Sequence, residues 1–204
     1  SSCFGSVNAL KRDMAAEVCA VLAAAAAKNN DKVGLIIFTD QVECFVPPRK
    51  GTKHIFKVIR EALYFKPRGV GTDIGRCLKY LEMVTTKRAV VFVISDFYAE
   101  GIKKPLSVSS RRHDLIAVNI LDPRDTDIPD AGMIELEDAE TGRRHLVDSS
   151  LRSFRDNYRN IALKKQEERK RFFYSLGIDR IEISTAKPYE EALIRFFGSR
   201  KTRK

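Results

Sequence analysis

The sequence predicts one α/β domain over residues 1–204, with a doubly wound, mostly parallel sheet and helices on both faces. Three observations predict this fold class. Short apolar runs bounded by turn residues alternate with segments whose apolar residues recur every three or four positions. The apolar runs are continuous, which is typical of strands covered on both faces. Of the 204 residues, 44% are hydrophobic, which is enough for one substantial core.

The first predicted helix covers residues 7–29, where apolar residues recur at helical steps and a run of alanines favours the helix. Ser6 is the expected N-cap. The run "KVGLIIFTD" predicts a buried strand, and "VECFV" predicts its antiparallel partner at the sheet edge, ended by "PPRKG". In such an alternation a strand should precede the first helix. We therefore expect the first, central strand of the sheet to be missing from the chain.

The alternation repeats through the middle of the chain. Thr52 is expected to cap a helix, "KPRGVG" to form a loop, and Thr72 or Asp73 to open the next helix. The runs "RAVVFVIS" and "DLIAVNIL" predict two further buried strands, with a weak helical segment at 104–112 between them. These elements extend the predicted parallel sheet.

The last third begins with a predicted β-hairpin within residues 131–148, whose turn is expected near Thr141 and Gly142. A basic helix follows over 151–176, then the strand "IDRIEIS", the helix "YEEALIRFF" and a basic tail at 199–204. The basic helix is expected to bury a stripe consisting of Leu151, Phe154, Tyr158, Ile161 and Leu176.

The formal net charge is +10. Residues 151–176 and the tail "RKTRK" carry much of the excess, so they could bind nucleic acid or an anionic membrane surface. The simpler interpretation is a solvated helix face and a loose tail. The chain has no Trp, which argues against nucleic acid as a partner.

The four cysteines are scattered and no two histidines share a metal-like spacing, which argues against a zinc site or a disulfide framework. No run reaches the roughly 18 apolar residues of a membrane span. Reduced thiols and this hydropathy predict a cytoplasmic protein. No P-loop, Gly-x-Ser-x-Gly elbow or dinucleotide motif occurs, and the aspartates within 122–130 are interpreted as a turn.

Oxygen-bearing residues lie at three predicted strand ends or in the loops beside them. They are Ser1, Ser2 and Ser6 in "SSCFGS", Thr72 and Asp73 in "RGVGTDIG", and Ser95 and Asp96 in "ISDFYAE". Ligands of open α/β sheets bind at the carboxyl ends of the strands. Hydroxyl and carboxylate oxygens suit Mg²⁺, so a magnesium site is one interpretation. The alternative is that Thr72 or Asp73 is a helix cap and that Asp96 ends a strand.

The motifs "VGLIIFTD", "FVPPRKGTKHIF", "RGVGTDIGRCLKYL", "AVVFVISDF", "RRHDLIAVNILDPRD", "DIPDAG" and "DAETGRRHLVD" together resemble the bacterial DUF58 family. The resemblance runs from about Phe4 to Phe197. It implies a domain of the von Willebrand factor A-like (vWA) class with a metal-ion-dependent adhesion site. By that resemblance, the metal ligands in this chain are Ser1, Thr72 and Asp96, with Ser2, Asp73 and Ser95 around them.

The resemblance also implies an aspartate and a serine of the same site that would lie upstream of Ser1. The expected cofactor is Mg²⁺, with Mn²⁺ or Ca²⁺ as substitutes. Two hydroxyls and one carboxylate make a poor Mg²⁺ site, because anionic ligands offset the dehydration of the ion. We therefore expect that metal is absent from this chain if those upstream ligands are missing.

The functional hypothesis is a non-catalytic protein-interaction domain, in which the metal captures a carboxylate of a partner. The resemblance implies that the partner is a MoxR-type AAA+ ATPase and that the pair acts like a chaperone in assembly. One alternative is a metal-dependent hydrolase that uses Asp96 at the same strand ends. The other is a nucleic-acid or membrane-binding module that acts through residues 151–176 and the basic tail, with peripheral attachment to anionic membranes.

Overall fold

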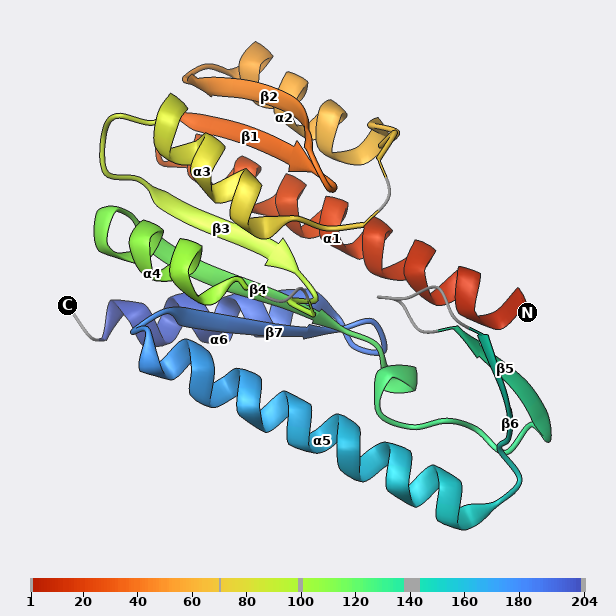
Figure 1. Cartoon of the computed structure of the whole chain (residues 1–204). Coiled ribbons are helices and arrows are strands. Elements are labelled where there is room, and N and C mark those ends of the chain that lie inside the picture. The colour runs from red at the N-terminus through yellow and green to blue at the C-terminus, as the bar shows by residue number, and fades with distance from the viewer. Residues whose placement is uncertain (1, 70, 99–100, 138–143, 203–204) are drawn as a thin grey trace.

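The computed structural model describes residues 2–69, 71–98, 101–137 and 144–202. Strands and helices alternate along most of the chain, as the sequence predicts (Figure 1). The elements are α1 (Ser2–Lys28), β1 (Val33–Phe38), β2 (Val42–Arg49), α2 (Thr52–Tyr64), α3 (Ile74–Val84), β3 (Val90–Ser95), α4 (Lys103–Arg112), β4 (Asp114–Leu121), the 3₁₀ turn η1 (Pro123–Asp125), β5 (Met133–Glu137), β6 (Arg144–Asp148), α5 (Arg152–Ser175), β7 (Asp179–Ser184) and α6 (Tyr189–Lys201).

The central sheet consists of three parallel strands in the order β3-β4-β7. Val90 pairs with Asp114 and Ile116 pairs with Asp179, so the three strands run in register and end at one edge of the sheet. β1 and β2 form a separate antiparallel pair, and β5 and β6 form the predicted hairpin. The predicted turn of this hairpin, near Thr141 and Gly142, lies outside the described residues.

Helices cover both faces of the parallel sheet (Figure 1). Residues of β4 alternate between the faces: Leu115 and Ala117 pack with α3, α4 and α5, whereas Ile116 and Val118 pack with α1 and α6. A third, smaller core joins α1 and α2 to β2. The fold is therefore the expected three-layer α/β arrangement, and its strand ends gather on one side.

β1 and β3, like β2 and β7, each have one unpaired edge among the described residues. Within the described part of the chain, β1 pairs only with β2 and β3 only with β4. Most side chains of β1 and β3 are only half-buried, although their apolar sequences are typical of fully covered strands. The central strand β4 is buried from Leu115 to Ile120. The described strands thus form a β1–β2 pair and a separate β3-β4-β7 sheet, and the additional central strand stays a prediction from sequence.

Three predicted boundaries are wrong. α1 begins at Ser2, so Ser6 is an interior helical residue and not the N-cap. Elongation of an existing helix adds one hydrogen bond per residue fixed, which favours continuation of this alanine-rich helix. Thr52 is the first residue of α2, and Gly51, with a φ of 104°, takes the cap position. β2 continues through Pro47 to Arg49, which an edge strand permits because its outer donors need no partner.

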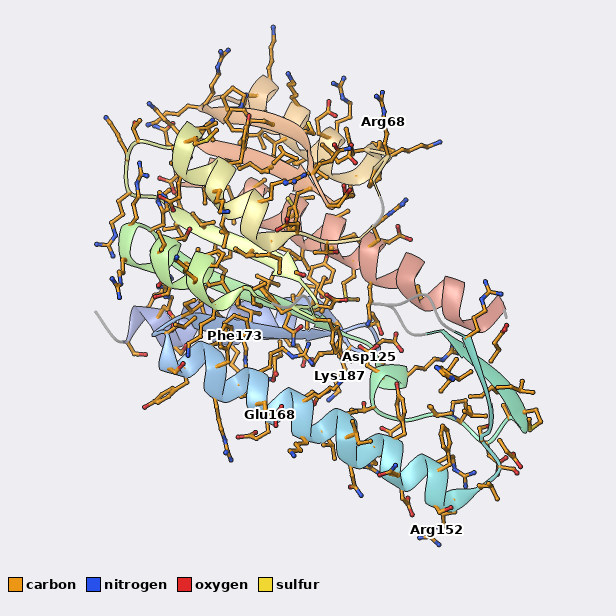
Figure 2. All side chains as sticks on the ribbon, in the orientation of Figure 1. Arg68, Asp125, Arg152, Glu168, Phe173 and Lys187 are labelled. Atoms are coloured by element: carbon orange, nitrogen blue, oxygen red, sulfur yellow. The ribbon has the colours of Figure 1, made fainter. Side chains whose placement is uncertain are left out.

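The predicted buried stripe of α5 is also partly wrong. Leu151 and Ile161 are exposed, whereas Phe173 is fully buried and Arg169 is almost so. Phe173 lies between α5 and the parallel sheet, while Arg152 lies at the outer end of the helix (Figure 2). The sheet contacts only the C-terminal half of α5, so the apolar period alone does not show which turns are covered. No helix of the described chain is long and apolar enough to cross a membrane.

Candidate functional site

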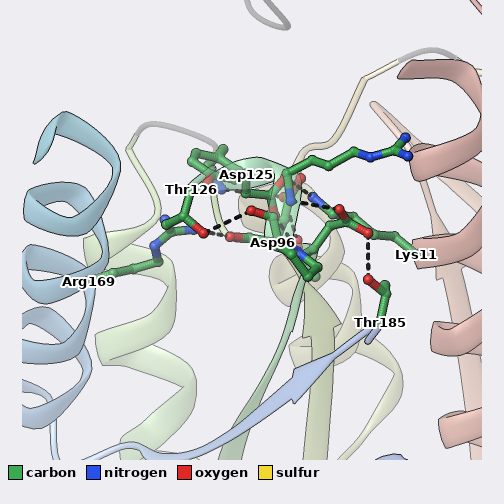
Figure 3. A network of polar contacts seen from close by, with 11 residues as sticks. Lys11, Asp96, Asp125, Thr126, Arg169 and Thr185 are labelled. Carbon is green, nitrogen blue, oxygen red and sulfur yellow. Dashed lines mark hydrogen bonds and ion pairs between the residues drawn. The ribbon is translucent and has the colours of Figure 1, made fainter. Parts of the chain in front are cut away.

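The carboxyl ends of the three parallel strands carry a group of polar residues (Figure 3). Asp96 follows β3, Asp122 follows β4 and Thr185 follows β7. The strands end together, so these residues share one edge of the sheet. This edge is the candidate site.

Asp96 is half-buried and its carboxylate has no cationic partner among the described residues. Its Oδ1 lies 3.4 Å from both the Ser95 hydroxyl and the Tyr98 amide. The Ser95 hydroxyl in turn accepts a hydrogen bond from the Phe97 amide at 3.2 Å. The carboxylate of Asp96 is therefore held by weak contacts only, and it can still accept a ligand.

The loop before α3 contains Thr72 and Asp73. A hydrogen bond from Gly69 to Glu43 joins this loop to β2. The Gly69 amide donates to Glu43 Oε1 at 2.6 Å, and this contact is the largest cause of the lowered pKa of Glu43. A Cβ on Gly69 would lie 2.2 Å from Asp40 Oδ1 and 2.3 Å from Thr39 Oγ1. Only glycine fits so close an approach.

Asp73 is the N-cap of α3, as one of the two interpretations of the sequence expects. Its Oδ1 accepts a hydrogen bond from the Arg76 amide at 2.8 Å, and its Oδ2 lies 3.9 Å from Arg76 Nε. Thr72 is exposed and makes no hydrogen bond within the described part of the chain. The carboxylate of Asp73 is thus occupied by contacts with Arg76, whereas the hydroxyl of Thr72 can still bind a ligand.

The predicted metal ligands do not form a complete site. Ser1 lies outside the described residues, as does the side chain of Ser2, whose backbone is helical. No group of three or more His, Cys, Asp or Glu side chains that could hold a metal occurs among the residues that the structure describes. Thr72, Ser95 and Asp96 together supply one carboxylate, which does not fit Mg²⁺ because the ion needs more anionic oxygen.

Sequence reasoning missed a network around Asp122, which is 7% exposed. Its Oδ1 accepts from the Arg124 amide at 2.9 Å, and its Oδ2 accepts from the Thr185 hydroxyl. Its own amide donates to Asp125, whose other oxygen binds Lys11 of α1 at 2.6 Å (Figure 3). The pair Asp122 and Asp125 is a capping box that the sequence "LDPRD" could have indicated. The partners Lys11 and Thr185 gave no local signal.

Much of the predicted basic surface is neutralised by ion pairs. Arg155 and Arg159 of α5 pair with Asp130 and Asp127, both at 3.3 Å. The predicted loose tail is partly wrong, because α6 continues to Lys201 and Arg200 binds Asp114 and Asp179 at 2.6 and 2.8 Å. The hydrogen bond to Asp114 is the largest cause of the raised pKa of Arg200.

The thiols of Cys19, which is half-buried, and of Cys77, which is buried, are poor nucleophiles. Burial raises the pKa of Cys19 to about 11 and that of Cys77 to about 12, so both stay protonated at neutral pH. Together with Cys44 they are free cysteines, as the sequence predicts.

A second polar cluster, at the amino ends of the strands, surrounds Glu82 of α3. Glu82 accepts hydrogen bonds from Ser109 at 2.8 Å and from Arg112 at 2.7 Å. The Nδ1 of His113, which is almost fully buried, accepts from the Ala89 amide at 3.2 Å. The Nε2 of His113 therefore carries the proton of the neutral ring, and it lies 3.5 Å from Glu82 Oε1.

His113 makes folding stability dependent on pH. Burial lowers its pKa in the folded state, and Glu82 opposes this effect only in part. Below the unfolded-state pKa of about 6.5, the unfolded chain binds a proton that the folded chain does not. The free energy of unfolding should therefore fall as the pH drops from 7 to 5, with a limiting slope of about 1.4 kcal/mol per pH unit. Urea unfolding at several pH values measures this slope, and the variant His113→Gln should show a shallower one. Equal slopes would contradict the prediction.

Comparison with known proteins identifies related sequences. The family model described as "Protein of unknown function DUF58" matches residues 1–168. Uncharacterized protein Rv1480 of Mycobacterium tuberculosis is 28% identical over 203 residues, which cover 97% of this chain and 63% of that protein. Uncharacterized protein MAV169 of Mycobacterium avium is 30% identical over 162 residues, which cover 76% of this chain and 94% of that protein. The chain thus spans less than two thirds of some of these relatives.

Two solved structures share the fold. Conserved hypothetical protein BatB from Bacteroides thetaiotaomicron superposes with a TM-score of 0.55 at 14% identity, covering 92% of this chain and 87% of that chain. An aerotolerance-related membrane protein from Bacteroides fragilis gives a TM-score of 0.53 at 17% identity, covering 90% and 86%. At these identities the likeness concerns the fold alone.

Proposed function

The chain belongs to the DUF58 family, which is described as proteins of unknown function, and from this premise we propose that it is a non-catalytic protein-interaction domain. Its binding surface is the edge formed by the carboxyl ends of β3, β4 and β7. The main support for this proposal is that the carboxylates at this edge differ in their partners. Asp122 and Asp125 are engaged in the network with Thr185 and Lys11, whereas the carboxylate of Asp96 forms no ion pair with the residues that the structure describes.

A half-buried carboxylate without a cationic partner is a favourable site for a positive ligand, because partial burial reduces the screening of its charge. Asp96 lies at the strand ends, where open α/β sheets bind their ligands. We expect either a divalent cation or a basic group of the partner to bind there. The interaction surface is therefore built on Asp96.

For the divalent cation, the proposal is an adhesion site for Mg²⁺, Mn²⁺ or Ca²⁺ that includes Thr72 and Asp96. The described residues supply too little anionic oxygen to hold such an ion by themselves, so the other ligands must come from outside them. The resemblance to vWA-like domains assigns one of these positions to Ser1.

The proposed partner is a MoxR-type AAA+ ATPase, with which the domain would act like a chaperone in assembly. This assignment rests on the family resemblance. The basic helix is a weaker candidate surface, because Arg155 and Arg159 are paired with carboxylates. We therefore place the partner at the strand ends and not on α5.

The experiment measures partner binding by calorimetry with the intact protein and the variants Asp96→Ala and Thr72→Ala. Asp96→Ala should weaken binding at least tenfold, a change of about 1.4 kcal/mol, and EDTA should weaken wild-type binding if a metal takes part. Asp31→Ala is the matched control, because Asp31 is exposed and precedes β1 at the opposite ends of the strands. Unchanged binding by both site variants would refute the proposal. Hydrolysis of phosphate esters that Asp96→Asn abolishes would favour the hydrolase instead.

A further inference from the structure

The turn after β3 has a backbone conformation that needs support from other parts of the molecule. Phe97 has a φ of 56°, in the left-handed region, which costs a residue with a side chain roughly 1–2 kcal/mol. Its ring is buried at 4% exposure. The carboxylate of Asp96 precedes this residue directly, so its direction depends on whether the strained turn is kept.

Two residues of α5 contact all three residues of the turn 96–98. Arg169 donates a hydrogen bond from Nη1 to the carbonyl oxygen of Asp96, and its guanidinium carbon lies 4.2 Å from the centre of the Tyr98 ring. Phe173 packs edge-on against Phe97, with ring centroids 4.9 Å apart. Arg169 and Phe173 are four positions apart and therefore lie on one face of the helix. We call this pair the α5 clamp.

Arg169 is unusual because it is only 8% exposed and has no carboxylate partner among the described residues. Buried arginines are ordinarily paired with acids, since removal of their charge from water is costly. Its partners here are a backbone oxygen and an aromatic face. A methionine at this position would fill similar space without the cost of removing a charge from water. Packing alone therefore does not require an arginine here.

We infer that Arg169 is a positioning residue for Asp96, so that α5 controls the direction in which the free carboxylate points. The inference rests on the proposed function, because it assigns the control of the same binding edge. Any shift of α5 along the sheet displaces Arg169 and Phe173 together. It therefore changes both the hydrogen bond to the Asp96 carbonyl and the packing against Phe97. Binding at Asp96 and the position of α5 are therefore coupled, and linkage makes the coupling reciprocal.

The first arm of the test measures the turn itself by amide hydrogen exchange. Arg169→Met should raise exchange of the Phe97 and Tyr98 amides about tenfold, while the core amides of β4 stay protected. Arg169→Lys should behave like Arg169→Met, because lysine lacks the planar fork that bonds the carbonyl and stacks on the ring. Lys170→Met is the control, since Lys170 is exposed on the same helix. Wild-type exchange in both Arg169 variants would overturn the inference.

The second arm is a double-mutant cycle on partner binding with Asp96→Ala. Arg169→Met should weaken binding about tenfold in the wild-type background and have no further effect when Asp96 is already alanine. Equal effects in both backgrounds would show that Arg169 contributes by packing alone and would overturn the positioning role. If Asp96→Ala leaves binding intact, the proposed function fails. Whether Arg169 holds the turn 96–98 is then decided by the hydrogen-exchange measurement alone.

Discussion

Replacement of Phe173 by alanine should lower the free energy of unfolding by about 3–5 kcal/mol. Phe173 is 1% exposed and is the largest fully buried side chain of the described residues. It joins α5 to the core formed by α3, α4 and the parallel sheet, and it packs against both Phe97 and Phe172. The loss removes its buried area and leaves a cavity, which close-packed surroundings fill only in part.

Tyr174→Ala is the control for this prediction, because it makes a similar truncation one position further along α5. Tyr174 is 88% exposed, so the change should stay within about 0.5 kcal/mol. Urea unfolding followed by circular dichroism gives both values. A loss below 1 kcal/mol for Phe173→Ala would mean that α5 does not pack as described. Because the free energy of unfolding of a domain is only about 5–15 kcal/mol, the expected loss is a large fraction of its total stability.

The second large effect is expected at Asp122. Asp122→Ala removes the acceptor of the Thr185 hydroxyl and of the Arg124 amide in a site that is almost fully buried. A hydrogen bond to a charged group such as this carboxylate is worth about 1.5–3 kcal/mol, and the loss of a cap costs about 1 kcal/mol, so we expect a total of about 2–4 kcal/mol. The connection between the ends of β4 and β7 should also loosen, which would increase amide exchange in residues 122–126.

The matched control is Asp127→Ala in the same loop. Asp127 is exposed and pairs with Arg159 at 3.3 Å across the surface, a contact worth little in water. This variant should change stability by less than about 0.5 kcal/mol. If Asp127→Ala and Asp122→Ala destabilise equally, the buried network does not hold the strand ends together. The two variants have the same change in charge, so the difference between them isolates burial and hydrogen bonding.

The order of strands and helices could be predicted because the signals for them are local. Continuous apolar runs predicted β1, β3 and β4, and the sequence limited the cap of α3 to Thr72 or Asp73, of which the structure uses Asp73. The starts of α1 and α2 could not be predicted, since several consecutive residues there are equally able to begin a helix. The sequence also predicts one more strand in the sheet, because a strand should feed each helix of this alternation, and this stays a prediction.

The candidate site also has one part that could be predicted from the sequence and one part that could not. Asp96 and Thr72 could be located from their positions after a strand and before a helix, together with the family resemblance. Which carboxylates are already engaged could not be predicted. Lys11 and Asp125 are 114 positions apart, and Asp122 and Thr185 are 63 apart. Such contacts depend on how the helices pack on the sheet, and no local pattern encodes them.

The sequence by itself thus determined the three-layer α/β fold, the positions of its main elements and one acidic residue at a strand end. The tertiary structure decided that Asp96 forms no ion pair with the described residues and that α5 contacts the strained turn around it. The physical reason is that apolar periodicity and caps act within a few residues, whereas the partner of a charge is set by which side chains meet after packing. Arg169 shows this most directly, because it lies among basic residues in the sequence yet binds a carbonyl oxygen 73 positions away.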